Sequence, residues 1–318
     1  MRRFSVAARW LWIFVVVGAA GCAHDAGSSG GTGSSVPPSP SLASTENSTS
    51  GTYANQPGAT ILFVYADSSH RAIIQNATEA AIAACMRSAG FRYEPIVRTD
   101  TSATDYLLLV DQSWGVFDRN VAARYGYGQP DEEPSPGGGA TSNDPAYIAA
   151  LFGPDGNQSI TQNVTDPITG QIVGTMTVRG GCVGDADNAV FGDPEVRNRY
   201  YALDLSIQSL AIDAITRARS SIPTLAALDA WSGCMKSKGY EYSDPMQPLS
   251  KDWSDPPTEE ELTTALADFD CKMTARLTET FRQEVANAAA VAADEHRQQV
   301  SDWTSLQAEI ERRLRPNS

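Results

Sequence analysis

The sequence predicts a mainly helical protein with one small β-hairpin, stapled by disulfides and ending in a long C-terminal helix or helical hairpin. Apolar residues recur at helical spacing along most of the chain, and one segment around "DPITG", residues 166–170, alternates β-favouring residues about a turn signal. The chain also has an even set of cysteines beyond Cys22. With 318 residues, 42% of them hydrophobic, it can build one large domain or two small ones.

The N-terminus predicts export and lipidation. Arg2 and Arg3 precede the apolar run "WLWIFVVVGAA", which is too short to span a bilayer comfortably and has the order of a secretory signal. Residues 1–21 are therefore expected to be a signal peptide. The next residue, Cys22, follows "AAG" and resembles the modified cysteine of a bacterial lipobox, although Leu is commoner than Ala19 at its position. The alternative is an ordinary signal peptide with an incidental cysteine.

Residues 22–58 are expected to be a flexible tether that carries a diacylglyceryl group on Cys22. From residue 23 onward this segment is Gly, Ser, Thr, Pro and Asn with hardly an aliphatic side chain, so it cannot bury a core. It would hold a body of residues 59–318, divided by one interpretation into sub-halves 59–192 and 193–318, at the outer face of the cell membrane.

The charge argues against a nucleic-acid partner. The formal net charge is −14, and removal of Arg2, Arg3 and Arg9 with the signal peptide would lower it to −17. Phosphates would be repelled by such a protein rather than neutralised. The acidity is better suited to keeping the protein soluble outside the cell.

The first elements of the body are predicted from local signals. A helix is expected from the capping candidates at 67–69 to the stop at Gly90, and a short helix ends at Gly126. Asn143 or Asp144 starts another, with Pro145 in its first turn. The alternating residues that follow then predict the hairpin, which delivers Cys182 to the start of the next helix.

The second half of the body is predicted to be helical almost to its end. One helix begins near Pro194, and another begins at Ser221 and stops at Gly239. Thr258 with Glu261 matches a capping box. No Gly or Pro interrupts residues 259–315, which predicts a very long helix or a helical hairpin. Its apolar side chains Trp303, Leu306 and Ile310 would be exposed if the helix projects alone, and would then offer a surface to a protein partner.

A repeated motif links the cysteines to these helices. "CMRSAGFRYEP", residues 85–95, returns as "CMKSKGYEYSDP", residues 234–245. Each copy predicts a cysteine on the last turns of a helix, then a glycine stop and two aromatic residues. Because Cys271 and Cys182 each lie early in a following predicted helix, we prefer the disulfides Cys85–Cys182 and Cys234–Cys271. The symmetric pair Cys85–Cys234 ranks second.

These motifs resemble those of a group of uncharacterised secreted lipoproteins of actinobacteria. The matching segments are short but are spread over most of the body; they are residues 85–93, 124–128, 180–186, 234–242 and 267–272. The resemblance implies export and disulfides, and it implies no reaction.

The sequence points to no catalytic residue, cofactor or metal. Only two histidines, His70 and His296, lie in the body, and no zinc, iron, nucleotide or nucleophile motif is present. Aromatic residues near the motifs could line a groove for a sugar, peptide or apolar ligand, or could simply cover the disulfides, which we favour. They are Tyr93, Trp114, Tyr125, Tyr127, Tyr240, Tyr242 and Trp253.

Together these observations favour a lipid-anchored extracytoplasmic envelope protein with a non-catalytic binding or scaffolding role. The alternative is a secreted hydrolase that uses two carboxylates on envelope glycans or peptides.

Overall fold

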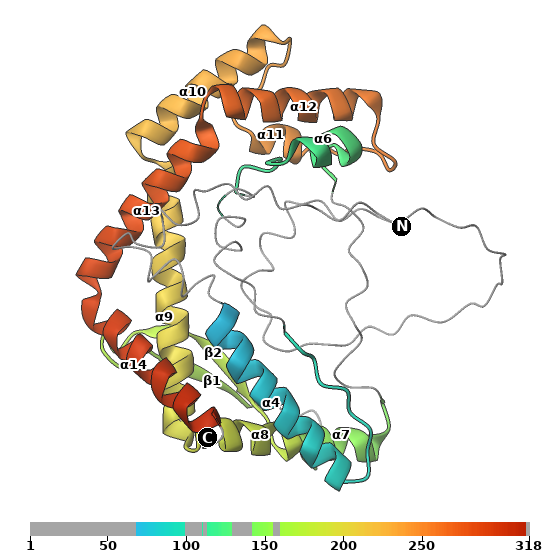
Figure 1. Cartoon of the computed structure of the whole chain (residues 1–318), viewed down its shortest axis with the longest axis vertical. Helices are drawn as coiled ribbons and strands as arrows, with labels where there is room; N and C mark the ends of the chain where they lie inside the picture. The colour runs from blue at the N-terminus through green and yellow to red at the C-terminus, as the bar shows by residue number, and fades with distance from the viewer. Residues whose placement is uncertain (1–67, 99–109, 111–112, 129–141, 155–159, 316–318) are drawn as a thin grey trace, which may run out of the picture.

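The structure is a computed structural model that describes residues 68–98, 110, 113–128, 142–154 and 160–315 (Figure 1). The predicted signal peptide, Cys22 and the tether lie outside the described residues. The helices and strands are, in chain order, α4 (Ser68–Ser88), α6 (Arg119–Tyr125), α7 (Pro145–Phe152), β1 (Ile160–Thr165), β2 (Ile172–Val178), α8 (Gly181–Phe191), α9 (Pro194–Arg219), α10 (Ile222–Ser237), α11 (Met246–Leu249), α12 (Glu259–Thr274), α13 (Leu277–Glu295) and α14 (Arg297–Leu314).

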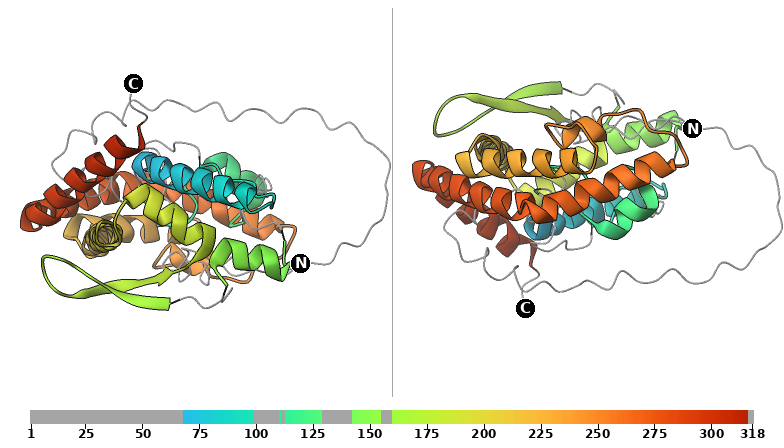
Figure 2. Two further views of the ribbon diagram at one scale, coloured as in Figure 1. Left: turned by 90° about the horizontal axis from the view of Figure 1, so that it is seen from below. Right: turned by 90° about the horizontal axis from the view of Figure 1, so that it is seen from above.

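Helix α9 is the central support of the molecule. Helices α13 and α14 pack along it, while α6, α10, α11 and α12 gather at one end and α4, α7 and α8 at the other (Figure 1). The hairpin packs on one side of α9 (Figure 2). The predicted class, mainly helical with one hairpin and two disulfides, is confirmed.

Local capping explains where five of the ten described helices begin. In each of these five, a side-chain oxygen of the residue before the helix accepts a hydrogen bond from an N–H of the first turn, which otherwise has no partner within the helix. The capping residues are Asp118 for α6, Asp144 for α7, Asp193 for α9, Ser221 for α10 and Thr258 for α12. A proline lies at the first or second position of α7, α9 and α10, as predicted for Pro145 of α7 and Pro194 of α9.

The two copies of the repeated motif end their helices in the same way. Gly90 and Gly239 have φ of 86° and 89°, and the next residue returns its N–H to the motif methionine. Phe91 N–H donates to the Met86 carbonyl at 2.9 Å, and Tyr240 N–H to the Met235 carbonyl at 3.0 Å. This five-residue return is the Schellman motif, in which the left-handed residue favours glycine. The predicted glycine stops are confirmed.

The hairpin is also confirmed. Strand β1 pairs antiparallel with β2, with Ile160 opposite Val178 and Asn163 opposite Thr175. Asp166 opens the turn: its carboxylate accepts hydrogen bonds of 2.8 Å from the N–H groups of Ile168 and Thr169. Such side-chain bonds to the backbone two and three residues on make Asp a strong turn residue.

The C-terminal stretch is almost entirely helical but is divided into α12, α13 and α14. The first division lies at Arg276, which adopts a left-handed φ of 51°, and the second at His296. Each division changes the direction of the chain (Figure 1). The result differs from one straight helix because α13 and α14 bend to follow α9 and bury their apolar stripe against it.

Trp303, Leu306 and Ile310 are buried within the molecule, at 0%, 5% and 0% exposure. They pack with Ile74 of α4, Phe191 of α8 and three residues of α9, Tyr200, Leu203 and Ile207. These side chains are therefore not exposed, and the reason for expecting a protein partner on this helix no longer holds. The same cluster joins elements from both sides of the 192/193 boundary between the expected sub-halves.

The ends of the described chain meet in this region. His70, in the first turn of α4, pairs through Nδ1 with Glu311 in the last turn of α14. Beside it, Arg71 NH2 lies 2.8 Å from Asp204 Oδ1 of α9. These contacts fix the start of α4 to α14 and to the central helix.

Candidate functional site at the two disulfides

The disulfides are the points where the repeated motif meets the rest of the fold. Cys85 bonds to Cys182 and Cys234 bonds to Cys271, with Cα–Cα distances of 5.5 and 5.6 Å. This is the pairing preferred from the sequence, and the symmetric Cys85–Cys234 bridge is not formed. One detail differs: Cys271 lies in the last turn of its helix rather than early in it, because α12 ends at Thr274.

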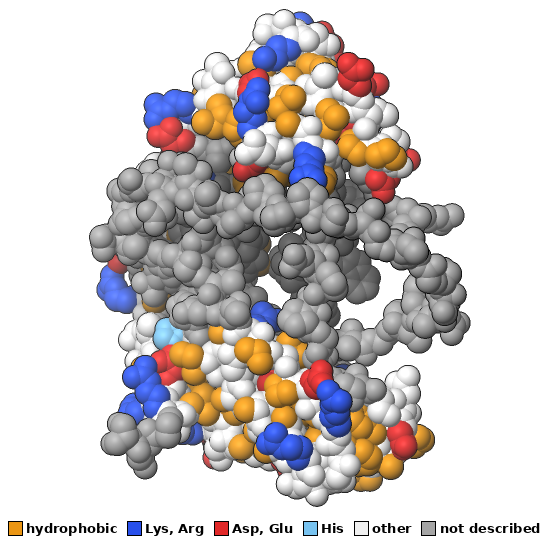
Figure 3. All heavy atoms as spheres, turned by 45° about the vertical axis from the view of Figure 1, so that its right-hand side comes forward, with side chains coloured by type: hydrophobic (Ala, Val, Ile, Leu, Met, Phe, Trp, Pro, Cys, Tyr) orange, Lys and Arg blue, Asp and Glu red, His pale blue; other side chains and the backbone are white. Residues whose placement is uncertain are grey.

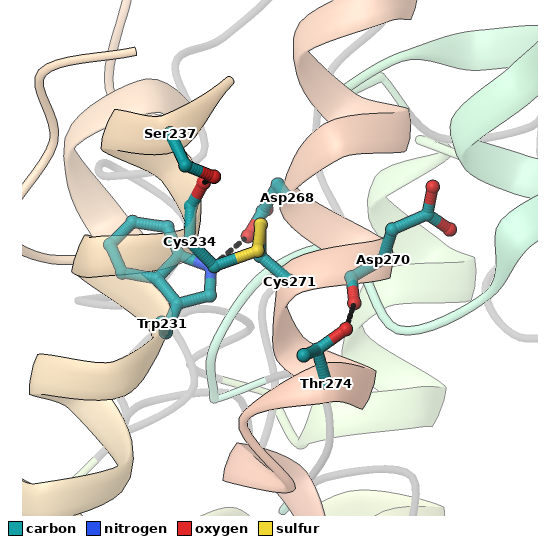
Figure 4. Close-up of a disulfide and its surroundings, with 7 residues drawn as sticks. All are labelled: Trp231, Cys234, Ser237, Asp268, Asp270, Cys271 and Thr274. Atoms are coloured by element: carbon teal, nitrogen blue, oxygen red, sulfur yellow. Dashed lines mark hydrogen bonds between the residues drawn. A yellow bond between two sulfur atoms is a disulfide. The ribbon is translucent and has the colours of Figure 1, made fainter. Parts of the chain in front are cut away.

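Two cross-links join α10 to α12 one helical turn apart. Beside the Cys234–Cys271 bridge, Trp231 Nε1 donates a hydrogen bond of 2.9 Å to Asp268 Oδ1 (Figure 4). Both pairs have a sequence separation of 37 residues, so equivalent turns of the two helices face each other. The bridge therefore holds α10 against the part of α12 that carries a buried carboxylate.

Asp268 forms a fully buried ion pair with Lys272. The two side chains are 0% and 2% exposed, and Lys272 Nζ lies 2.8 Å from Asp268 Oδ2. The same Nζ donates to the carbonyl of Val116 at 3.0 Å and to that of Trp114. Three acceptors around one nitrogen match the three protons of an ammonium group. Lys272 thus ties the 114–116 segment to α12.

Burial acts on both partners of this pair. It raises the pKa of Asp268, against the lowering effect of the Lys272 charge and of the bond from Trp231. It lowers the pKa of Lys272, against the raising effect of the Asp268 charge. The attraction between the two charges and the three hydrogen bonds of the Lys272 ammonium therefore have to offset the cost of burying the pair. Burial, and then the Asp268 charge, also raises the pKa of the neighbouring Tyr127 hydroxyl.

The "RYGYG" segment closes this cluster from the side of α6. Gly126 has φ of 60°, and a Cβ placed there would lie 2.6 Å from Glu261 Cγ, so only glycine fits. The next residue, Tyr127, donates its N–H to Glu261 Oε1 at 3.0 Å. Glu261 N–H donates to Thr258 Oγ1 at 3.2 Å, as the capping box predicts. Its carboxylate reaches across to the α6 loop, a contact that the pattern does not predict.

The first disulfide has an apolar environment with one acidic neighbour. Cys182, Met86 and Tyr147 are buried around it, and Phe91 meets Tyr147 edge to face with centroids 5.5 Å apart. The exposed Asp185 places Oδ2 4.0 Å from Cys85 Sγ. This bridge fastens the end of α4 to the first turn of α8.

A second buried carboxylate lies at the hairpin turn. Asp166 is 1% exposed, and Oδ2 accepts hydrogen bonds from Ser206 Oγ of α9 and from Gln299 Nε2 of α14, the latter at 2.7 Å. Gln299 Oε1 in turn lies 2.7 Å from His296 Nδ1. Burial would raise the pKa of Asp166, but the bonds from Ser206, Gln299 and the turn N–H groups lower it to about 2.

The aromatic residues proposed for a ligand groove are distributed among separate clusters. Tyr93 packs with the first disulfide and donates its hydroxyl to Glu79 at 2.8 Å. Trp114, Tyr240 and Tyr242 belong to the cluster around the second disulfide. Tyr127 and Trp253 stack on each other at 5.7 Å, and Arg124 lies over the Tyr125 ring. Tyr93 and Tyr242, one from each motif copy, therefore do not share a surface.

Sequence reasoning missed Asp166, Trp231, Asp268 and Lys272. A signal existed for two of them: Asp268 and Lys272 stand three residues before and one after Cys271, on the side of the helix that the bridge draws inward. Asp166 was recognised only as a turn residue, because nothing in its local sequence names Ser206 or Gln299 as partners.

The described residues contain neither a membrane-spanning helix nor a metal-binding cluster. No described helix is long and apolar enough to cross a membrane, and no three described His, Cys, Asp or Glu side chains gather as metal ligands. On the face shown in Figure 3, basic and acidic side chains alternate at both ends of the molecule. No model of a protein family, no curated protein and no solved structure matches the chain.

Proposed function

We propose that this protein is a lipid-anchored extracytoplasmic protein whose disulfide-fastened body acts by binding or scaffolding. The observation that carries the proposal is the pair of disulfides between separate helices. Such bridges persist in oxidising compartments and are rare in the cytosol. The signal-like N-terminus and Cys22 supply the route to that compartment and the attachment to the membrane.

The buried carboxylates support a non-catalytic role. Asp166, Glu261 and Asp268 are at most 1% exposed, and each accepts hydrogen bonds from groups of the protein itself. A glycosidase needs two carboxyl groups that reach the substrate. These three instead hold the hairpin, the α6 loop and α10 in place.

Membrane attachment can be tested at Cys22. We expect Cys22→Ala to move the protein from the membrane fraction to the soluble fraction in a bacterial host with lipoprotein processing. Cys85→Ala is the matched control, because it changes a cysteine of the body and should leave attachment intact. A Cys22→Ala protein that stays tightly bound to membranes would overturn the lipid anchor.

The non-catalytic role requires a separate test. The full chain, solubilised in detergent, would be incubated with purified cell-wall glycan and separated by sedimentation. A binding protein should sediment with the glycan without releasing new reducing ends. Release of reducing ends above that of a boiled sample would favour the hydrolase instead.

A further inference from the structure

In both disulfides the two cysteines differ in burial, and in the same order along the chain. The second cysteine of each pair is buried, with Cys182 3% and Cys271 0% exposed. The first cysteine, Cys85 or Cys234, is only partly buried at the edge of its cluster. Each bridge therefore presents one of its two sulfur-bearing residues toward solvent, and in both copies it is the cysteine of the repeated motif.

The approach to the motif cysteines is open. The residue before each is small and exposed: Ala84 before Cys85 and Gly233 before Cys234. A Cβ added at Gly233 would meet no atom within 4 Å. The residues after the motif methionines, 87–90 and 236–239, are exposed as well. The repeat thus surrounds a partly buried cysteine with exposed residues, besides forming the helix stop already described.

The order of the cysteines along the chain also distinguishes the two members of each pair. Each bridge joins two cysteines of the body that are consecutive in the sequence, so the pairs do not interleave. A chain exported from its N-terminus presents Cys85 before Cys182, and Cys234 before Cys271. The cysteine that emerges first in each pair is therefore also the one that stays partly accessible after folding.

We infer that Cys85 and Cys234 are the sulfurs at which an extracytoplasmic dithiol–disulfide exchange enzyme acts on this protein, while Cys182 and Cys271 are the resolving cysteines. In oxidation, the Cys234 thiolate attacks the disulfide of the enzyme, and one enzyme sulfur leaves as a thiolate. The Cys271 thiolate then attacks the Cys234 sulfur of this mixed disulfide and releases the second enzyme sulfur. The protein loses two electrons and the enzyme disulfide gains them, ending as a dithiol. Cys85 and Cys182 follow the same two steps.

The sulfur that is attacked can be identified in the wild-type protein. The detergent-solubilised full chain would be treated with reduced glutathione, quenched with acid and mapped by mass spectrometry. We expect at least about tenfold more glutathione on Cys234 than on Cys271, and on Cys85 than on Cys182, because exchange requires access to the attacked sulfur. Equal labelling, or labelling of the buried cysteines, would overturn the inference. The inference uses the export in the proposed function, but this measurement is independent of where the protein resides.

Asp185 provides an internal control. Its carboxylate lies beside Cys85 Sγ and should repel the anionic glutathione thiolate, whereas Cys234 has no such contact among the described residues. Asp185→Asn should raise the rate of adduct formation at Cys85 by about two- to fivefold, in proportion to the removed repulsion, and leave Cys234 unchanged. An equal rise in the rate at Cys85 and Cys234 would show that the substitution loosens the whole fold. That result would contradict direct attack of glutathione at Cys85.

The enzyme step needs its own probe. The probe is a purified extracytoplasmic dithiol oxidase whose second active-site cysteine is replaced by alanine. This variant cannot resolve a mixed disulfide by attack of its own second cysteine. Its remaining active-site cysteine is first joined in a disulfide to thionitrobenzoate. A thiolate of the reduced full chain then attacks the enzyme sulfur, thionitrobenzoate leaves, and the resulting adducts should map to Cys85 and Cys234. The matched variants are Cys271→Ala, which should retain the adduct at Cys234, and Cys234→Ala, which should form none at Cys271. Adducts at Cys182 or Cys271 would refute the assigned roles.

Discussion

At the scale of single residues, the fold depends on charges that the solvent does not reach. Lys272 satisfies three acceptors from two segments, and Asp166 joins the hairpin turn to α9 and α14. Each group is stable only because all of its partners are present, since a buried polar group without a partner is costly. Both residues should therefore be sensitive to substitution in ways that an exposed charge is not.

Lys272→Met should strongly destabilise the protein, because it removes the ammonium and leaves the Asp268 carboxylate buried. Breaking a buried ion pair at one partner costs about 3–5 kcal/mol. Urea denaturation at pH 7 would measure the free energy of unfolding, with the exposed Lys238→Met as the matched control. The double variant Asp268→Leu/Lys272→Met should recover part of the loss. A Lys272→Met protein as stable as the wild type would contradict the role of the pair.

Asp166→Asn should remove a pH-dependent part of the stability. The pKa of Asp166 is about 2 in the folded protein against an ordinary value of 3.8. A carboxyl group whose pKa is lowered by folding stabilises the fold at pH values above its ordinary pKa. This contribution is lost as the pH falls from about 4 to about 2. The expected loss at pH 7 is about 2 kcal/mol, shrinking toward zero near pH 2.

Denaturation of wild type and Asp166→Asn at pH 7, 4 and 2.5 would follow this difference. Asp213→Asn, an exposed change on α9, the helix whose Ser206 contacts Asp166, is the control. A difference that stays constant over this range would show that Asp166 does not act through its charge.

The sequence could not identify these residues as buried. Hydrophobic periodicity places apolar side chains, but a charge inside the core is selected by partners that lie far away, such as Val116 for Lys272 and Gln299 for Asp166. In contrast, the cysteines and Gly126 could be recognised, because bridge formation and a left-handed turn are properties of the residue types themselves.

At the scale of elements, starts and stops were predictable and bends were not. The caps at Asp144, Ser221 and Thr258 and the stops at Gly90 and Gly239 follow from local hydrogen bonding. The divisions at Arg276 and His296 carry no Gly or Pro. They arise because α13 and α14 pack on α9, and that packing is tertiary.

The two motif glycines provide a test at this scale. Gly239→Ala should destabilise the protein by about 1 kcal/mol, since an L-residue resists the φ of 89°. Gly90→Ala should behave alike. Gly233→Ala in α10 is the matched control and should stabilise by about 0.5–1 kcal/mol, because the site is helical and open. Thermal unfolding of the three variants would decide; equal effects at 233 and 239 would contradict the Schellman assignment.

At the scale of the whole molecule, the disulfides fasten opposite ends of one connected core. The sequence predicted the amphipathic C-terminal stripe but not its partner, because an apolar stripe does not specify what covers it. In the structure α14 returns to α4 and α8 and buries Trp303. The two bridges therefore restrain different loops around a shared scaffold.

Removing the bridges should have similar but unequal effects. The double variants Cys85→Ala/Cys182→Ala and Cys234→Ala/Cys271→Ala open loops with sequence separations of 97 and 37 residues. The chain-entropy model gives losses of about 5 and about 4 kcal/mol. Denaturation of the two variants and the wild type, with and without a thiol reductant, would measure both losses, since reduction of the wild type should remove the contributions of both bridges. A much larger loss for the shorter loop would show that the Trp231–Asp268 contact depends on its bridge.

The contact between His70 and Glu311 has a consequence for how the protein can be engineered and observed. Because the first and last described helices touch, a fluorescent protein fused directly after α14 would lie near the start of α4. Such a reporter would lie close to the start of α4, whereas one inserted after α10 would lie at the opposite end of the molecule (Figure 1). A circularly permuted chain with a short peptide joining the two ends should likewise keep the helices in place.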